Sequence, residues 1–321
     1  TDVEISGNGG GAITVQPGVQ LTGLTGLTLT GNGQDGVRHT GGNVIAGETW
    51  KSFGYPYYVV DGSVYVRGSG SPVLTIEPGV VVKVGNSLLI SAGDGGTGSL
   101  RAIGTAEKPI TFTTVGAVAP DRWRGLWLMT GSGGTRLENV VVEGGGWGQT
   151  SGINVTGSAP VLKNATVRTS AYRGIRVEAG GAPEITDSTV TGTTGGVGIE
   201  IGAGATAKLL RVAIRQCATH GLLVGTAGEA ELTDVEISGN GGGAITVQPG
   251  VQLTGLTGLT LTGNGQDGVR HTGGNVIAGE TWKSFGYPYY VVDGSVYVRG
   301  SGSPVLTIEP GVVVKVGNSL L

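Results

Sequence analysis

The opening segment of the chain occurs twice. Residues 1–89 reappear without a single substitution as residues 233–321, which defines a 232-residue repeating unit. Both chain ends fall inside this unit, and we therefore expect a longer tandem array of which the sequence holds one unit and part of the next. We divide the chain into the end of one repeat (1–43), one complete repeat (44–275) and the start of another (276–321).

A shorter period runs inside the unit. A phrase of the form Leu-x-(Asn/Asp)-(small apolar)-x-(Val/Ile), followed by Gly-Ile-x-Val, recurs at nearly constant spacing. Each phrase alternates apolar and polar residues, as a half-buried strand does, and is too short and too rich in glycine for a helix. The phrases begin at Leu137, Leu162, Ile185, Leu209, Leu232 and Leu256.

Such short strands can bury an apolar face only if consecutive phrases stack in parallel register. We therefore predict an all-β solenoid with about 23 residues per coil and about ten coils per 232-residue repeat. Two apolar columns should line its interior, the first formed by Val140, Ala165, Ser188, Val212, Val235 and Leu259, the second by Val142, Val167, Val190, Ile214, Ile237 and Leu261.

A column of small and polar residues follows at the next bend. It contains Cys217, Asn240 and Asn264, and Asn8 and Asn32 are the copies of the two asparagines. Stacked asparagines in parallel strands can form an amide ladder. We expect such a ladder here, and we expect Cys217 to be a buried structural residue, because small sulfur-containing side chains are commonly buried.

Composition limits the function classes. Only 13% of the residues are charged and the net charge is −3, so the chain lacks the basic field that nucleic acids or anionic membranes attract. At 38% hydrophobic residues it can build a core, yet it holds no apolar run of the ~20 residues needed to cross a bilayer. With Cys217 as its single cysteine, it cannot form an internal disulfide.

Three further segments resemble a known family. They read VLTIEPGVVVKVG (73–85), LRAIGTAEKPITFTT (100–114) and DRWRGLWL (121–128). Together they resemble the recurrent module of bacterial right-handed parallel β-helix surface proteins, and the shorter phrases resemble the β-helix repeat of the pectate-lyase-like superfamily. The resemblance implies a right-handed single-stranded parallel β-helix, export from the cell, and a surface or adhesin role. It does not imply lyase activity, because a fold does not carry a function.

Catalytic and metal sites find little support in the sequence. Asp187 and Asp234 share a column, but Arg211 lies between them, and alternating charge is typical of a solvated ladder. We therefore expect no enzymatic activity. The histidines lack a Cys or His partner at ligand spacing, so we expect neither a metal nor a cofactor; they are His39, His220 and His271.

Aromatic residues gather in the less regular part of the repeat, and they are the candidate contacts for sugars or partner proteins. Exposed rings can stack on sugars, and a patch that recurs in every unit would bind with avidity. The structural alternative is that these rings cover the core or pack against neighbouring chains. The candidates are Trp50, Tyr55, Tyr57, Tyr58, Trp123 and Trp147.

The perfect repeat favours a structural function. We expect an extracellular or cell-surface fibre or stalk that serves projection, adhesion, or assembly of a filament or sheath. Its partners would be copies of itself, joined end to end or laterally, and glycans or surfaces. The alternative is a carbohydrate-binding or polysaccharide-degrading β-helix.

Overall fold

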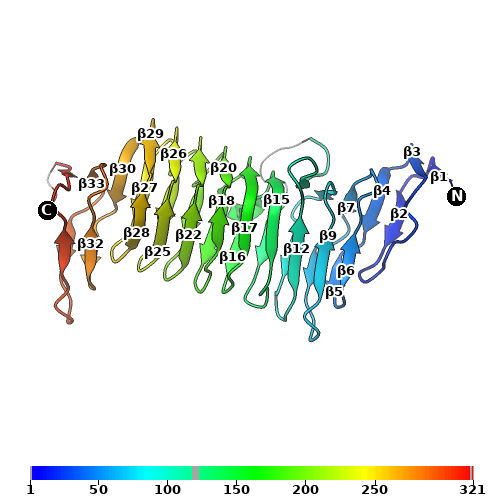
Figure 1. Ribbon diagram of the computed structural model, residues 1–321, viewed down its shortest axis with the longest axis horizontal. Helices are drawn as coiled ribbons and strands as arrows, with labels where there is room; N and C mark the ends of the chain where they lie inside the picture. Colours follow the sequence, from blue (N-terminus) through cyan, green and yellow to red (C-terminus); the bar gives the residue numbers. More distant parts are fainter. Residues whose placement is uncertain (1, 118–122, 319, 321) are drawn as a thin grey trace.

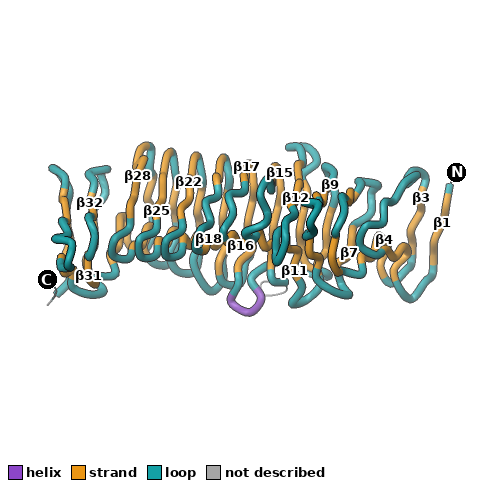
Figure 2. The backbone as a smooth tube through the Cα atoms, turned by 90° about the horizontal axis from the view of Figure 1, so that it is seen from below, coloured by secondary structure: helices purple, strands orange, loops and turns teal. Residues whose placement is uncertain are grey.

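The computed structural model describes residues 2–117, 123–318 and 320. The chain forms an elongated rod of stacked coils with the two termini at opposite ends (Figure 1). A second view at a right angle shows the same stacking along the whole rod (Figure 2). Strands of successive coils pair in parallel, which confirms the predicted all-β parallel β-helix. The described residues form a single short helix, η1 (Trp147–Gln149).

Three ladders run along the rod, and each coil between its two ends contributes one strand to each ladder. Ladder I consists of β6 (Glu48–Trp50), β9 (Val73–Ile76), β12 (Ser99–Ile103), the first halves of β15 (Arg136–Glu143) and β17 (Val161–Arg168), β19 (Glu184–Thr186), β22 (Thr206–Leu210), β25 (Glu229–Thr233) and β28 (Gln252–Thr257).

Ladder II takes the second halves of β15 and β17, which continue around the corner from ladder I. Its other members are β2 (Gly11–Val15), β4 (Gln34–His39), β7 (Tyr57–Val59), β10 (Val81–Val84), β13 (Ile110–Thr114), β20 (Thr189–Thr191), β23 (Ala213–Arg215), β26 (Glu236–Ser238) and β29 (Thr260–Thr262).

Ladder III is a continuous 12-stranded sheet. Its strands are β5 (Gly42–Val44), β8 (Val64–Val66), β11 (Leu89–Ala92), β14 (Gly125–Leu128), β16 (Ser151–Thr156), β18 (Arg173–Glu178), β21 (Ile199–Ile201), β24 (Leu222–Val224), β27 (Gly243–Val247), β30 (Gln266–His271), β33 (Tyr289–Val291) and β36 (Val314–Val316).

Short separate pairs complete the two ends of the rod. These are β1 (Val3–Ser6) with β3 (Leu27–Thr30), β31 (Gly274–Val276) with β34 (Val296–Val298), and β32 (Glu280–Trp282) with β35 (Leu306–Ile308).

The predicted interior columns are buried, except that Leu259 is only partly buried. Val142, Val167 and Val190 are paired neighbours on consecutive coils, and all three are buried. The Asn/Asp position of the phrase is the corner between ladders I and II. Asn139 and Asn164 adopt φ of 47° and 49° there, in the left-handed region that asparagine and aspartate tolerate better than most residues. The left-handed backbone conformation at this corner therefore explains why asparagine and aspartate recur there.

The predicted amide ladder is also present. Asn240 Nδ2 donates to Asn264 Oδ1 at 2.8 Å, and Asn8 Nδ2 donates to Asn32 Oδ1 at the same distance. Asn240 Oδ1 in turn accepts the Cys217 backbone N–H at 2.9 Å. Cys217 is buried, and burial raises the pKa of its thiol, in keeping with a structural position.

The number of coils per repeat differs from the prediction of ten. Ladder II takes nine steps from β4 to β29, through β7, β10, β13, β15, β17, β20, β23 and β26. The copy of β4 is β30, which is one face further on, in ladder III. The 232-residue unit therefore spans nine coils and a third. Identical sequence in the two copies consequently lies on different faces of the rod.

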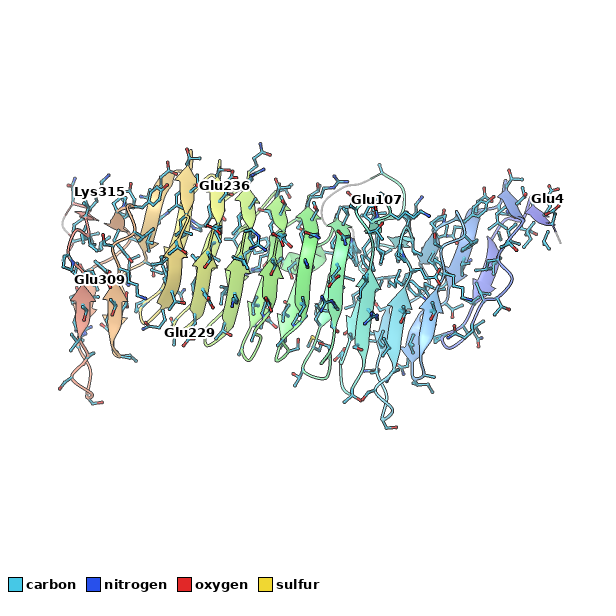
Figure 3. All side chains as sticks on the ribbon, viewed as in Figure 1. Glu4, Glu107, Glu229, Glu236, Glu309 and Lys315 are labelled. Atoms are coloured by element: carbon cyan, nitrogen blue, oxygen red, sulfur yellow. The ribbon has the colours of Figure 1, made fainter. Side chains whose placement is uncertain are left out.

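Among the described residues, no helix is both long enough and apolar enough to span a membrane. Outward side chains cover the coils along the rod, as for Glu229 on β25 and Glu236 on β26 (Figure 3).

Candidate functional site

Three of the six candidate aromatics lie in the core. Trp50 is 1% exposed and Tyr57 2%, and their rings stack at 5.0 Å between centroids. Trp123 is fully buried, and its Nε1 donates to the Glu143 carbonyl oxygen at 2.9 Å. None of the three can contact a ligand directly, so for them the structural alternative applies: they pack the interior.

Trp50 belongs to a buried polar cluster that sequence reasoning missed. Glu48 accepts hydrogen bonds from Trp50 Nε1 at 2.7 Å and from the Gly18 backbone N–H at 2.8 Å. His39 Nε2 lies 3.2 Å from Glu48 Oε1, while His39 Nδ1 accepts the Gly41 N–H at 3.1 Å. The equivalent cluster of His271, Glu280 and Trp282 repeats this arrangement in the second copy.

The other three candidates are accessible but do not form one patch. Tyr55 is half-buried, and its hydroxyl accepts the Leu29 N–H at 3.0 Å. Tyr58 points outward from ladder II beneath the Lys83 ammonium, 5.5 Å from the ring centroid. Trp147, in η1, is 42% exposed. A common sugar platform of the six predicted aromatics is therefore absent.

A different set of residues forms one column in which each residue is the register partner of the next, and we call it the ladder III strip: Tyr65, Ser91, Trp127, Asn154, Arg176 and Glu200. Within it Ser91 and Asn154 are buried, whereas Tyr65, Trp127, Arg176 and Glu200 are partly exposed. Strand alternation explains these directions. In VYV and GLWL the flanking valines and leucines fill the core, so Tyr65 and Trp127 must point outward.

Each aromatic ring of the strip, and Tyr172 beside it, carries a guanidinium group. Arg124 lies over the Trp127 ring at 4.5 Å, and Arg67 lies over Tyr65 at 4.9 Å. Arg173 covers Tyr172 at 4.6 Å. Cation–π contacts of this kind hold both the ring and the cation in place at a partly exposed site.

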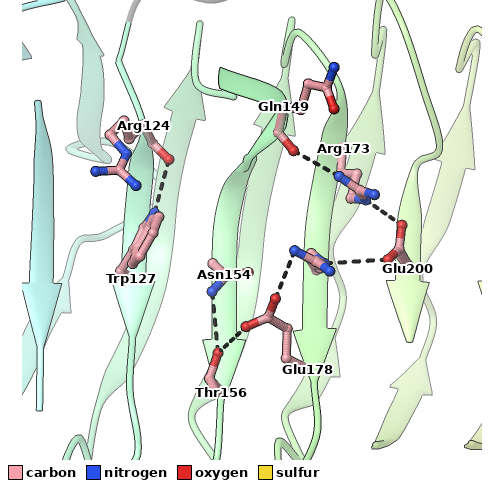
Figure 4. A network of polar contacts seen from close by, with 9 residues as sticks. Arg124, Trp127, Gln149, Asn154, Thr156, Arg173, Glu178 and Glu200 are labelled. Atoms are coloured by element: carbon pink, nitrogen blue, oxygen red, sulfur yellow. Dashed lines mark hydrogen bonds and ion pairs between the residues drawn. The ribbon is translucent and has the colours of Figure 1, made fainter. Parts of the chain in front are cut away.

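An ion-pair network continues the strip toward the C-terminal end (Figure 4). Arg176 joins two carboxylates, with Nη1 at 2.7 Å from Glu178 and Nε at 3.3 Å from Glu200. Arg173 also pairs with Glu200, and Thr156 Oγ1 donates to Glu178 Oε2 at 2.7 Å. The carboxylates and guanidinium groups are thus fixed in position and neutralise one another.

A hollow of about 180 Å³ opens beside this network, lined by Tyr172, Arg173, Val197, Glu200 and Leu223 among others. Aromatic faces next to hydroxyl, amide, carboxylate and guanidinium groups supply both the stacking and the hydrogen bonds that a sugar ring uses. Within the described part of the chain, no three His, Cys, Asp or Glu side chains gather in a way that could hold a metal ion.

The column that holds Asp187 and Asp234 does not provide a pair of carboxylates for acid–base catalysis. Asp187 pairs with Arg211, whose Nη2 lies 3.0 Å from Asp187 Oδ2. Hydrogen bonding to Arg211 lowers the pKa of Asp187. The alternation of charge expected for a solvated ladder is therefore what the structure shows at this position.

Comparison with known proteins identifies the fold. The family model described as "Right handed beta helix region" matches residues 124–306. No curated protein matches the sequence. Among solved structures, a single-site mutant of the periplasmic alginate epimerase AlgG has a TM-score of 0.40 and 14% identity, over 83% of this chain and 77% of that chain. Pectate lyase Pel9A has a TM-score of 0.42 and 12% identity, over 81% of this chain and 79% of that chain.

These comparisons correct one expectation. Both solved structures are named as enzymes, an epimerase and a lyase, whereas the sequence led us to expect no enzymatic activity. This finding contradicts that expectation. We therefore withdraw it.

Proposed function

Because the chain belongs to the right-handed β-helix family, we propose that it is a polysaccharide-binding protein whose ligand lies along the ladder III strip. The observation that carries the proposal is the alignment of Tyr65, Trp127 and Arg176 in one outward column. Consecutive coils are about 4.8 Å apart, so the column presents contacts along the direction of an extended polymer. A linear polysaccharide can therefore contact several of them at once.

The electrostatics favour an acidic polymer. Three guanidinium groups, those of Arg67, Arg124 and Arg173, lie on aromatic rings of this face. Arginine matches carboxylate geometry with two parallel N–H donors. Among the described residues, Arg67 and Arg124 form no ion pair with a carboxylate, so they can bind the carboxylates of uronate residues.

The test is the affinity of the chain for soluble polysaccharides. Trp127→Ala should weaken binding of polygalacturonate about tenfold, which corresponds to ~1.4 kcal/mol. Isothermal titration calorimetry against polygalacturonate and against neutral dextran measures both the affinity and the preference for acidic polymer. Unchanged affinity in Trp127→Ala would contradict the proposal. The same mixtures, followed by the size of the polymer, would also show whether the chain cleaves it.

The repeat supplies a matched control for Tyr65. Tyr297 is the copy of Tyr65 in the same local sequence, and Arg299 covers its ring at 4.7 Å. Tyr297 lies on β34 and pairs with Asn275, away from the strip. Tyr65→Ala should therefore weaken binding and Tyr297→Ala should not, although the two substitutions are chemically identical.

A structural role is the second candidate function, and the identity of residues 1–89 with residues 233–321 favours it. We infer a stiff extracellular or cell-surface rod built of tandem units, with copies of itself, glycans or surfaces as partners. Negative-stain electron microscopy of the natural full-length protein tests this role. Long rods of uniform width would support it, and compact particles would contradict it.

A further inference from the structure

The two sequence copies present the same surface hollow. In the first copy a hollow of about 260 Å³ is lined by Tyr55, Pro56, Val81 and Lys83 among others. In the second copy a hollow of about 300 Å³ is lined by the equivalent residues, Tyr287, Pro288, Val313 and Lys315. Lys315 is labelled on the C-terminal coil in Figure 3. The feature is therefore a property of the repeated sequence.

The wall of each hollow is held in place. The Tyr55 hydroxyl accepts the Leu29 N–H, and the Tyr55 ring packs against Phe53 with centroids 5.9 Å apart. The second copy repeats both contacts, with Tyr287 accepting the Leu261 N–H at 3.1 Å. A tyrosine fixed in this way offers a ring face without losing rotational freedom on binding.

A cation lies beside each wall. Lys83 Nζ is 5.5 Å from the Tyr58 ring centroid, and Lys315 Nζ is 5.1 Å from that of Tyr290. Within the described residues, no carboxylate lies within ion-pair distance of either lysine. A ring face, a proline and an uncompensated ammonium group match a sugar ring that carries a carboxylate.

The two hollows face different sides of the rod. Tyr58 and Lys83 lie on ladder II, whereas Tyr290 and Lys315 lie on ladder III. The cause is the unit of nine coils and a third, which turns each copy by one face relative to the previous copy. The axial separation of the two hollows is about 45 Å at ~4.8 Å per coil. One extended polymer strand that follows a single face cannot occupy both.

We propose that the chain cross-links acidic polysaccharide, with the Tyr55–Lys83 hollow holding a strand on ladder II and sites on ladder III holding another. The proposal rests on the proposed function for its ligand class. It adds that repeats offset by a third of a turn direct identical sites to different faces, so successive units gather separate strands around the rod.

The experiment compares Lys83→Glu with Lys315→Glu in the 321-residue chain. Light scattering of mixtures with long polygalacturonate reports cross-linking, and calorimetry with hexagalacturonate reports each site. Lys83→Glu removes the site on ladder II and should abolish cross-linking while binding persists. If Lys83→Glu cross-links polygalacturonate as well as the wild-type chain, the proposal is overturned.

The behaviour of Lys315→Glu separates this proposal from the proposed function. If the ladder III strip binds polymer, Lys315→Glu still cross-links, because the strip and the first hollow face different sides. If the strip does not bind, both variants lose cross-linking, which leaves the two hollows as the linking sites. Neutral dextran, which lacks carboxylates, should not be cross-linked by any variant, and cross-linking of dextran would refute the role of Lys83.

Discussion

At the scale of single residues, the buried Glu48 carboxylate is the group on which the interior of the first coils depends. It accepts hydrogen bonds from Trp50 Nε1 and the Gly18 N–H, and it lies within ion-pair distance of His39. Glu48→Ala would leave these donors buried without an acceptor, which costs about 3–5 kcal/mol for a broken buried pair. Urea unfolding followed by circular dichroism measures the loss. The exposed Glu184→Ala is the control and should change stability by less than about 0.5 kcal/mol.

The same carboxylate predicts acid sensitivity. Burial alone would raise the pKa of Glu48, but hydrogen bonds from His39, Gly18 and Trp50 outweigh it, so the pKa is lower in the folded chain. A group with a lowered folded pKa stabilises the fold above its unfolded pKa, about 4.3, and this contribution disappears as the pH falls through the folded value. The difference in unfolding free energy between wild type and Glu48→Gln should therefore be largest at pH 7 and shrink toward pH 3. An equal difference at both pH values would show that Glu48 is not the titrating group.

The aromatic residues show what sequence could and could not predict at this scale. Tyr57 and Tyr58 are adjacent, so one must point inward and the other outward, but both are aromatic and the alternation does not decide which. Trp50 lies inside together with the charged Glu48, against the rule that acidic residues stay exposed. Trp127 could have been assigned outward from the leucines on either side of it. In the Arg176 network, Glu178 lies two residues further along the same strand, but Glu200 comes from the next coil, and no local pattern signals this second pair.

At the scale of elements, the glycine of the Gly-Ile-x-Val phrase is set by close packing between coils. A Cβ on Gly198 would lie 2.4 Å from Ile214 Cγ2 and 2.7 Å from the Gly221 carbonyl oxygen. Gly198→Ala should therefore destabilise the rod by about 1–3 kcal/mol through overpacking. Gly133, whose added Cβ would meet nothing within 4 Å, provides the control. Thermal unfolding of Gly198→Ala and Gly133→Ala compares them, and equal midpoints would contradict this explanation of the phrase.

The sequence separation between paired strands was predictable where the phrase is regular, but not where the phrase breaks. The register partners Val167 and Val190 lie one phrase length apart in the sequence, as predicted. In the irregular part, Val37 and its partner Tyr57 are closer in sequence than one phrase length, whereas Phe112 and its partner Val142 are further apart. Loops of variable length leave no periodic trace, so dividing the unit by the phrase length gave ten coils where the structure has nine and a third.

At the scale of the whole molecule, the rod is a stack in which each coil contacts mainly its neighbours, so one complete coil should be removable. Leu209 pairs with Ile185 on one side and with Leu232 on the other. Deletion of residues 209–231 would place Leu232 where Leu209 was and keep every later strand on its face. We expect a folded rod with the same strand content per residue by circular dichroism. Deletion of residues 209–219, about half a coil, shifts all later strands to the wrong face. Limited proteolysis should then cut that variant after the junction and spare the first. If both deletions resist the protease equally, the face on which each strand lies is not what keeps the later coils in register.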